Sequence, residues 1–241
     1  MMAETVIFVP SYDGYADIWP IASDLFNRFW PDRPWPIYWM TNGHPIPINA
    51  YAVLAPAVHR NEWGNNIANA LEQLCADRIL FWVEEQLLLS KVPNDLLFEA
   101  SNILDTNPDV GIIGLTRYYS QSGFAANQKR LGNFAYCDYN ISFTNALPAL
   151  FRKEVLIHLL RSHSKSNEFE QESHKVMFRD LPSVKALTPA RSTFSFCDNS
   201  MINGLWRRCA VKHLKELKFD IDFHQRGIHP DECRFMDGTP A

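Results

Sequence analysis

The sequence predicts an α/β domain built around a mainly parallel sheet, and two observations support this. Short apolar runs at Val6–Val9, Ile37–Met40 and Ile79–Val83 are too short for helices and are typical of strands buried on both faces. Between the first two runs, residues 18–30 place apolar side chains at helical spacing. A strand, a helix and a strand in this order predict parallel neighbours joined by a right-handed crossover.

The elements are expected in the following order. The turn at 10–15 ends the first strand, and Pro20 is tolerable if it lies in the first turn of the helix. After the strand at 37–40, the pattern predicts a short strand within 51–58 and then a helix to about Cys75, capped by Asn65 or Asn66. The strand at 79–83 follows. A helix from 92 to about 104 and a strand at 110–115 come next. Residues 118–131 are expected to form a loop, and residues 134–144 two short strands around Asp138. Helices are expected at 148–161 and 168–178, and short strands at 194–196 and 200–202. The last expected element is a basic amphipathic helix at 206–217.

The bulk properties indicate one domain. The chain has 241 residues, of which 46% are hydrophobic and 21% charged, so it can bury a sizeable core. We expect a single domain over residues 1–218 and a polar C-terminal arm over 219–241. A net charge of −4 argues against nucleic acid as a partner, which needs a basic surface.

The chain also indicates a cytoplasmic protein. Its five cysteines are far apart and form no C-x-x-C pair, which favours reduced thiols. The N-terminus lacks the pattern of a signal peptide, and no apolar run approaches the roughly 20 residues of a membrane span. Membrane association is therefore expected to be peripheral at most.

An acidic pair follows the third apolar run. Glu84 and Glu85 stand at the C-terminal end of a strand expected to be buried, where charge is unfavourable unless it is solvated, paired or bound to a cation. In open α/β sheets this end of the strands is where ligands bind. Oxygen ligands of this kind suit Mg²⁺ or Mn²⁺ beside a phosphate. The alternative is a strand followed by a solvated polar turn.

The predicted topology brings further polar residues to the same edge. The loops after the first two strands open beside the acidic pair, because parallel strands end on one edge. This places Ser11, Tyr12, Asp13 and Asn42 near the carboxylates.

A second acidic group, Glu168 and Glu170, opens a predicted helix and could supply a general base. The alternative is an acidic first turn stabilised by the helix dipole. The histidines do not show the H-E-x-x-H spacing of zinc hydrolases, and the G-x-G-x-x-G, P-loop and G-x-S-x-G motifs are absent from the sequence. These absences argue against a dinucleotide dehydrogenase, a P-loop NTPase and an α/β-hydrolase.

Taken together and in order, several stretches resemble a nucleotide-sugar glycosyltransferase of the GT-A type, and more narrowly a group of small single-domain bacterial glycosyltransferases. The matching stretches are Val6 to Tyr12 with the following helix, Trp39 to Gly43, Trp63 to Leu74, Ile79 to Leu89, Pro148 to Arg152, Glu168 to Glu170, and Ile202 to Trp206. The resemblance implies a GT-A (Rossmann-like) fold, with a mixed, mainly parallel central sheet flanked by helices. It also implies a sugar moved from a nucleotide-diphosphate sugar to a glycan or lipid-linked acceptor, as in polysaccharide biosynthesis.

The resemblance also implies roles for individual residues. Ser11, Tyr12 and Asp13 would contact the nucleotide, and we add Asn42 and Trp63 to this group. Glu84 and Glu85 would hold a divalent cation (Mn²⁺ or Mg²⁺) and the diphosphate. Glu170, with Glu168 second, would be the base that activates the acceptor in an inverting reaction; a retaining reaction would not require it.

Two positions depart from the family pattern. The acidic motif usually contains aspartates, whereas this chain has two glutamates, and the aromatic residue expected before the later acidic pair is Asn167. One alternative is therefore a degenerate GT-A domain that binds a glycan or a partner protein without catalysis. The other is a nucleotidyltransferase, which would require a glycine- and lysine-rich loop after the first strand, unlike residues 10–15.

Overall fold

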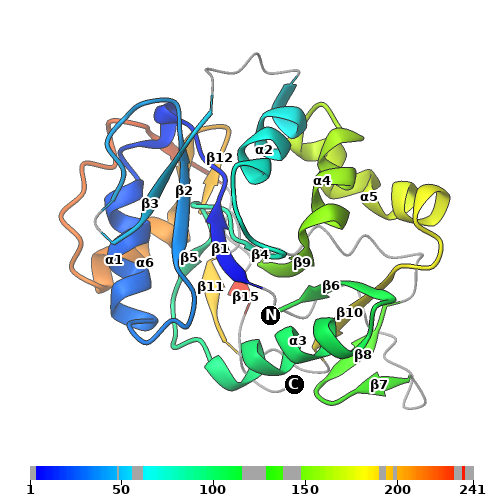
Figure 1. Ribbon diagram of the computed structural model, residues 1–241. Coiled ribbons are helices and arrows are strands. Elements are labelled where there is room, and N and C mark those ends of the chain that lie inside the picture. The colour runs from blue at the N-terminus through cyan, green and yellow to red at the C-terminus, as the bar shows by residue number, and fades with distance from the viewer. Residues whose placement is uncertain are drawn as a thin grey trace.

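The computed structural model describes residues 4–47, 49–55, 62–115, 129–137, 148–189, 194–197, 200–230 and 235–236. Nine of its strands form one sheet in the order β3-β2-β1-β4-β9-β6-β10-β8-β7 (Figure 1). These strands are β1 (Thr5–Val9), β2 (Ile37–Thr41), β3 (Tyr51–Leu54), β4 (Arg78–Phe81), β6 (Val110–Gly114), β7 (Arg130–Leu131), β8 (Phe134–Tyr136), β9 (Ala149–Arg152) and β10 (Lys185–Pro189).

The strand directions define the fold class. Strand β1 pairs in parallel with β2 and β4, so that Ile7 lies between Ile37 and Leu80, and β3 is parallel to β2. Strand β9 runs antiparallel between β4 and β6, and β8 is antiparallel to β10 and β7. The other seven strands run in one direction. This mixed, mainly parallel sheet flanked by helices is GT-A-like (Rossmann-like), which confirms the predicted fold class.

Helices cover both faces of the sheet (Figure 1). One face packs against α1 (Trp19–Phe29), α3 (Asn94–Thr106) and α6 (Arg208–Glu216), and the other against α2 (Trp63–Glu72), α4 (Lys153–Arg161) and α5 (Ser166–Asp180). Alternate residues of β1 enter the two cores: Ile7 and Val9 pack on the α1 side, Val6 and Phe8 on the α2 side. Burial on both faces is why the strand is a continuous apolar run.

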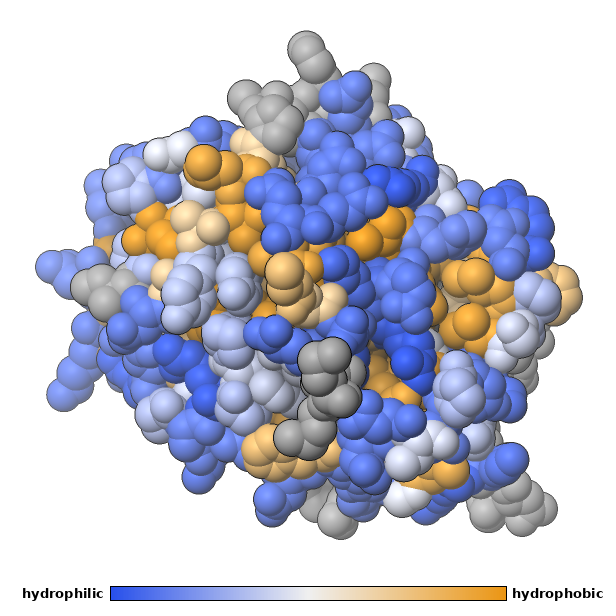
Figure 2. Space-filling view, in the orientation of Figure 1, coloured by the Kyte–Doolittle hydropathy of each residue, from blue (hydrophilic) through white to orange (hydrophobic). Residues whose placement is uncertain are grey.

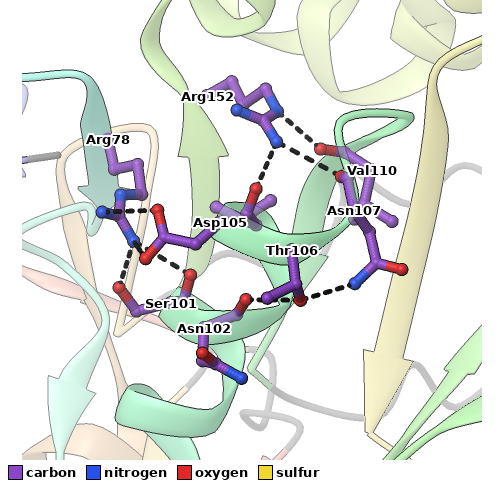
Figure 3. Close-up of polar contacts among 9 residues, drawn as sticks. Arg78, Ser101, Asn102, Asp105, Thr106, Asn107, Val110 and Arg152 are labelled. Atoms are coloured by element: carbon purple, nitrogen blue, oxygen red, sulfur yellow. Dashed lines mark hydrogen bonds and ion pairs between the residues drawn. The ribbon is translucent and has the colours of Figure 1, made fainter. Parts of the chain in front are cut away.

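Two arginines attach the C-terminal half of α3 to the sheet (Figure 3). Arg78, at the start of β4 and 3% exposed, donates to the Ser101 carbonyl at 2.9 Å and pairs with Asp105 at 3.0 Å. Arg152, at the end of β9, donates to carbonyls at the end of α3 and to the Val110 carbonyl at 2.8 Å. Because the last carbonyls of a helix lack intrahelical partners, Arg152 caps α3.

Several sequence expectations about elements were wrong. Residues 149–152 form β9 rather than the start of a helix, because this apolar run is buried between β4 and β6. Leu205–Arg207 forms β13, and α6 begins only at Arg208. Neither Asn65 nor Asn66 caps α2, whose first residue is Trp63; the Asn66 side chain donates to the Glu62 carbonyl from inside the helix. Strand β10 was not expected at all.

Smaller elements complete the chain. Strands β5 (Leu87–Leu88), β11 (Phe196–Cys197) and β15 (Phe235–Met236) form one small sheet, and β12 (Met201–Ile202), β13 and β14 (Ile228–His229) form another. The expected strands near 194–196 and 200–202 are thus present. The last residues of the expected loop at 118–131 form β7 (Arg130–Leu131) instead, because they pair with β8. Residues 118–128 of that loop, and Asp138 with the strand expected after it, lie outside the described residues.

One cysteine differs from expectation, and the described part of the C-terminal segment can be placed against the domain. Cys75 and Cys137 are free, but Cys209 is disulfide-bonded, so the expectation of reduced thiols was wrong for that residue. The described part of the expected arm, 219–230, packs on the domain: Phe223 is 5% exposed and meets Trp206 edge-on, with 5.6 Å between ring centroids. A boundary at 218 stays a prediction.

The face of the molecule seen in Figure 2 is mostly hydrophilic, with separate apolar areas on it. On the outer strand β3, Leu54 and Tyr51 are 63% and 60% exposed. In the described parts of the chain, no helix has the length and apolar character needed to cross a membrane.

Candidate functional site

The site is built where β1, β2 and β4 end on one edge of the sheet. Parallel pairing brings the residues that follow these strands together. The Ser11 hydroxyl, after β1, donates to Glu84 Oε1, after β4, at 2.7 Å. Trp19 Nε1 of α1 in turn donates to Ser11 Oγ at 2.7 Å. Ser11 is therefore fixed between the helix and the carboxylate.

Glu84 is an acidic side chain buried at this edge. It is 5% exposed, and its second oxygen, Oε2, is buried and has no hydrogen-bond partner within the described structure. Burial raises the pKa of Glu84 to about 7, although the Ser11 hydrogen bond and the charge of Arg226 act to lower it. Near neutral pH both the protonated and the charged form of this carboxyl are therefore populated.

The turn that carries Glu84 contains further buried polar groups. Glu85, which is half-buried, accepts a hydrogen bond at its backbone carbonyl from Ser200 N at 3.0 Å. Trp82 Nε1 donates to the Gln86 carbonyl at 2.9 Å. Among the described residues, Gln86 Oε1 and Ser200 Oγ are buried without a hydrogen-bond partner. The turn is anchored by its backbone, and Gln86, two residues after Glu84, adds a second unsatisfied polar atom to it.

Asp13 organises the loops that follow β1 and β2. Its carboxylate accepts from Thr41 Oγ1 and Asn42 N, both at 2.8 Å, and from His44 N at 3.0 Å. Asn42 Oδ1 accepts from Asp13 N at 3.2 Å. Burial acts to raise the pKa of Asp13, but these three hydrogen bonds lower it below the ordinary value. The predicted residues Asp13 and Asn42 thus lie together, and Asp13 serves first as a loop organiser.

Tyr12 is the exposed aromatic residue of the same loop. It is 50% exposed, and its ring lies against Gly14, where an added Cβ would be 2.3 Å from the ring. The ring also meets Tyr15 edge-on at 5.0 Å. Half of this aromatic surface is therefore open to a flat ligand at the edge of the sheet.

Arg226 completes the site and was not anticipated from the sequence. Its Nε donates to Asp17 at 2.6 Å, its Nη2 donates to the Gly14 carbonyl at 2.6 Å, and its guanidinium lies 5.0 Å from the Tyr15 ring centroid. Burial raises the pKa of Tyr15, and the negative charge of Glu85 acts in the same direction. Tyr15 and Arg226 therefore lie close enough to the acidic pair to interact with it electrostatically.

Three other predicted residues lie around the start of α5. Trp63 packs against Phe169, with 5.6 Å between ring centroids, and Phe169 packs against Phe81 at the end of β4. This contact is on the face of the sheet opposite Trp19. Glu168 accepts from Ser164 N at 3.1 Å and pairs with Lys165 at 3.7 Å, which is the contact expected of an acidic helix start.

Glu170 is exposed on α5, one residue beyond the buried Phe169. The functional roles of Trp63, Glu168 and Glu170 stay predictions.

The donors at the edge suit a hard cation only in part. The unsatisfied Glu84 Oε2 and the carboxylate of Glu85 are oxygen donors of the kind that Mg²⁺ and Mn²⁺ prefer. Within the described residues, no group of three or more His, Cys, Asp and Glu side chains could enclose a metal ion. The protein would thus supply two ligands, and a phosphate and water would have to supply the others.

Comparison with known proteins finds only weak similarity, and only to solved structures. No protein-family model and no curated protein sequence matches it. Solved structures match weakly. The chain is similar to 2-C-methyl-D-erythritol 4-phosphate cytidylyltransferase from Thermus thermophilus, with a TM-score of 0.48 and 11% identity over 90% of this chain and 100% of that one.

Two further structures show the same level of similarity. The S. aureus TarS 1-349 structure in complex with UDP gives a TM-score of 0.46 and 10% identity over 79% of this chain and 59% of that one. The bifunctional IspDF from Campylobacter jejuni gives a TM-score of 0.40 and 12% identity over 73% of this chain. This chain spans about half (47%) of the length of that protein. The chain resembles these proteins in part of its backbone arrangement only.

Proposed function

We propose that the protein is a nucleotide-sugar glycosyltransferase whose donor binds at the edge formed by β1, β2 and β4. The observation that carries this proposal is Glu84: a buried carboxyl at the end of the central strand, held by Ser11 and left with one oxygen unsatisfied within the described structure. A buried polar atom without a partner is unfavourable, and a ligand that supplied the missing partner would remove this cost.

Glu84 and Glu85 would hold a divalent cation. When bound, that ion would neutralise the charge that develops on the leaving diphosphate. The residues themselves define the rest of the site. Ser11 fixes the orientation of Glu84, and Arg226 contributes a positive charge on the same side of the edge. A diphosphate is strongly anionic, so an edge with two carboxylates needs such positive charge to accept it.

The nucleotide would lie on the loops after β1 and β2. Tyr12 offers an exposed ring against which a base can stack, and Asp13 holds the Asn42 loop in place beside it. Trp63 lies next to Phe169 and would border the site from α2. For an inverting reaction, Glu170, an exposed carboxylate on α5, would take the proton of the acceptor hydroxyl, with Glu168 the second choice.

The two alternatives make different demands. A nucleotidyltransferase needs cationic or glycine-rich groups to cradle a triphosphate, whereas residues 10–15 contain one glycine and no lysine. A degenerate domain would bind the nucleotide sugar without cleaving it. Glutamates in place of the usual aspartates support this second alternative, because the longer side chain changes the reach toward a metal.

The decisive experiment is calorimetric titration with a panel of nucleoside diphosphates, with and without Mn²⁺, followed by a hydrolysis screen of the matching nucleotide sugars. We expect one nucleotide to bind, with higher affinity in Mn²⁺, and its sugar to be released slowly. Glu84→Gln and Glu85→Gln should lose the Mn²⁺ effect. Glu172→Gln, an exposed carboxylate elsewhere on α5, is the matched control.

Each alternative has its own result. Failure of every nucleotide to bind in any metal condition would overturn the proposal. Release of pyrophosphate from a nucleoside triphosphate would identify a nucleotidyltransferase, and binding without hydrolysis or transfer to any acceptor would identify the degenerate domain.

A further inference from the structure

A row of cations marks the outer face of α6. Arg208, Lys212 and Lys215 are spaced by four and three residues on α6 and are all exposed, and exposed Lys218 follows two residues after the helix ends. We name these four residues the basic stripe. The opposite face of α6 is apolar and buried through Ala210, Val211 and Leu214, so the helix cannot rotate the stripe away from solvent.

The charge of the stripe is local. Residues 207–218 contain five Lys or Arg residues and one Glu, a formal charge of +4, whereas the whole chain carries −4. The rest of the chain, outside residues 207–218, therefore has a formal charge of −8. Within the described part of the chain, Arg208, Lys212 and Lys218 form no ion pair, and Glu216 lies beside His213 instead, at 3.8 Å. The stripe is an unneutralised positive surface on a negatively charged protein.

Helix stability does not account for this pattern. Cations in the last turn, such as Lys215, favour the helix dipole. Arg208 is the first residue of α6, where a cation is unfavourable, and the first turn contains no acidic residue to balance it. Lys215 has a structural contact, since its Nζ lies 5.7 Å from the Phe223 ring centroid. Among the described residues, the other three cations have no such aromatic contact.

We propose that the basic stripe docks the protein onto anionic phospholipid headgroups. A planar anionic surface can meet one positive face while the remaining negative surface points away from it. A long nucleic acid fits less well, because the excess of negative charge elsewhere repels it. The contact would be electrostatic and sensitive to salt, since the exposed face of α6 lacks an apolar row to insert.

The basic stripe is connected to the site through β13. Strand β13 leads directly into α6, and its Trp206 donates to the Gly227 carbonyl at 3.0 Å, next to Arg226. Docking would therefore hold the segment that carries Arg226 at the membrane surface. For the proposed transferase, this would favour a lipid-linked acceptor, although binding to the surface does not depend on the transferase activity.

The test is cosedimentation of the full chain with vesicles, without any nucleotide. Phosphatidylcholine vesicles containing phosphatidylglycerol should bind the protein, pure phosphatidylcholine vesicles should not, and high salt should release it. The triple variant Arg208→Gln, Lys212→Gln, Lys218→Gln should lose about fivefold in partitioning per cation, roughly a hundredfold in all. It spares Lys215 and its contact with Phe223.

The matched control is Lys91→Gln, Lys165→Gln, Lys175→Gln, which removes the same charge from exposed lysines on other elements. It should retain binding, and thermal melting should show both triple variants folded. No binding of the wild type to anionic vesicles, or equal losses in the two triple variants, would overturn the proposal. So would stripe-dependent binding to duplex DNA in the absence of vesicle binding. Vesicle binding can succeed or fail independently of the nucleotide titrations.

Discussion

Ser11 Oγ donates a 2.7 Å hydrogen bond to Glu84 Oε1, which joins the ends of β1 and β4 across 73 residues of sequence. Both residues are buried, at 6% and 5% exposure. Since Ser11 also accepts from Trp19, its hydroxyl proton is committed to the carboxylate. This relationship fixes one oxygen of Glu84 and leaves the other for a ligand.

The first prediction concerns Glu84 and pH. Burial raises the pKa of Glu84 from 4.5 to about 7. Between these values the folded protein binds a proton that the unfolded chain has lost, so the free energy of unfolding falls as pH rises through this window and levels off above it. Glu84→Gln cannot ionise. Its free energy of unfolding relative to wild type should therefore rise by up to about 3 kcal/mol over the window.

Denaturant titrations in EDTA at a series of pH values would measure this difference. Glu85→Gln, at the half-buried neighbouring position, is the control and should track the wild type more closely. Parallel pH profiles for wild type and Glu84→Gln would contradict the assignment of this titration to Glu84.

The second prediction removes the Ser11 hydroxyl. Ser11→Ala leaves Trp19 Nε1 and Glu84 Oε1 without their partner in a buried setting. The expected loss is about 1–3 kcal/mol of unfolding free energy. Because the Ser11 hydrogen bond lowers the pKa of Glu84, its loss should also move the Glu84 titration to higher pH.

Urea unfolding of Ser11→Ala at acid and at neutral pH separates the two effects. Ser162→Ala, which removes an exposed hydroxyl, serves as the control. A stability equal to wild type at both pH values would show that the hydrogen bond is not made.

The third prediction concerns the contact between α2 and α4. A Cβ on Gly64 would lie 2.0 Å from the Leu160 carbonyl oxygen and 2.2 Å from that of His163. These are backbone atoms at the end of α4, so they cannot move aside as a side chain would. Gly64→Ala should destabilise the protein by about 1–3 kcal/mol or more, although alanine is the better helix former.

Thermal unfolding compared with Asn65→Ala, an exposed substitution on the same helix, measures this loss. If Gly64→Ala were as stable as that control, the close approach of α2 to α4 would be wrong.

These structural relationships explain which parts of the fold the sequence revealed. Strands β1 and β4 were predictable because burial on both faces makes them uninterrupted apolar runs. Strand β9 has the same apolar character, but it leads into α4 without a break, so periodicity could not separate strand from helix. Strand β10 begins with Lys185 and ends with Pro189, so its sequence does not show the uninterrupted apolar run typical of a buried strand.

The same reasoning applies to the site. Parallel topology alone predicted that residues after β1 and β2 would meet Glu84, and Ser11 does so. Arg226 could not be predicted in this way, because it reaches the site from a polar segment whose position depends on the packing of Phe223 against Trp206. No local spacing connects such a residue to a strand end.

The last prediction uses Arg226 to test how the C-terminal segment affects Glu84. Arg226 pairs with Asp17, and its charge lowers the pKa of Glu84. Arg226→Gln removes both effects, so the Glu84 titration should move to higher pH. Arg226→Lys keeps the charge but loses the forked contact with Asp17 and the Gly14 carbonyl, so it should shift the titration less while still weakening the attachment of the segment.

The pH dependence of unfolding, measured for the wild type and both variants, reads the titration directly. Limited proteolysis of the native proteins measures how firmly the C-terminal segment is held on the domain. Both variants should be cleaved faster than the wild type within residues 219–230. If all three proteins shared one titration midpoint, the charge of Arg226 would not reach Glu84. If cleavage were unchanged as well, the contact with Asp17 would not hold the segment on the domain, and Arg226 would have no place in the site.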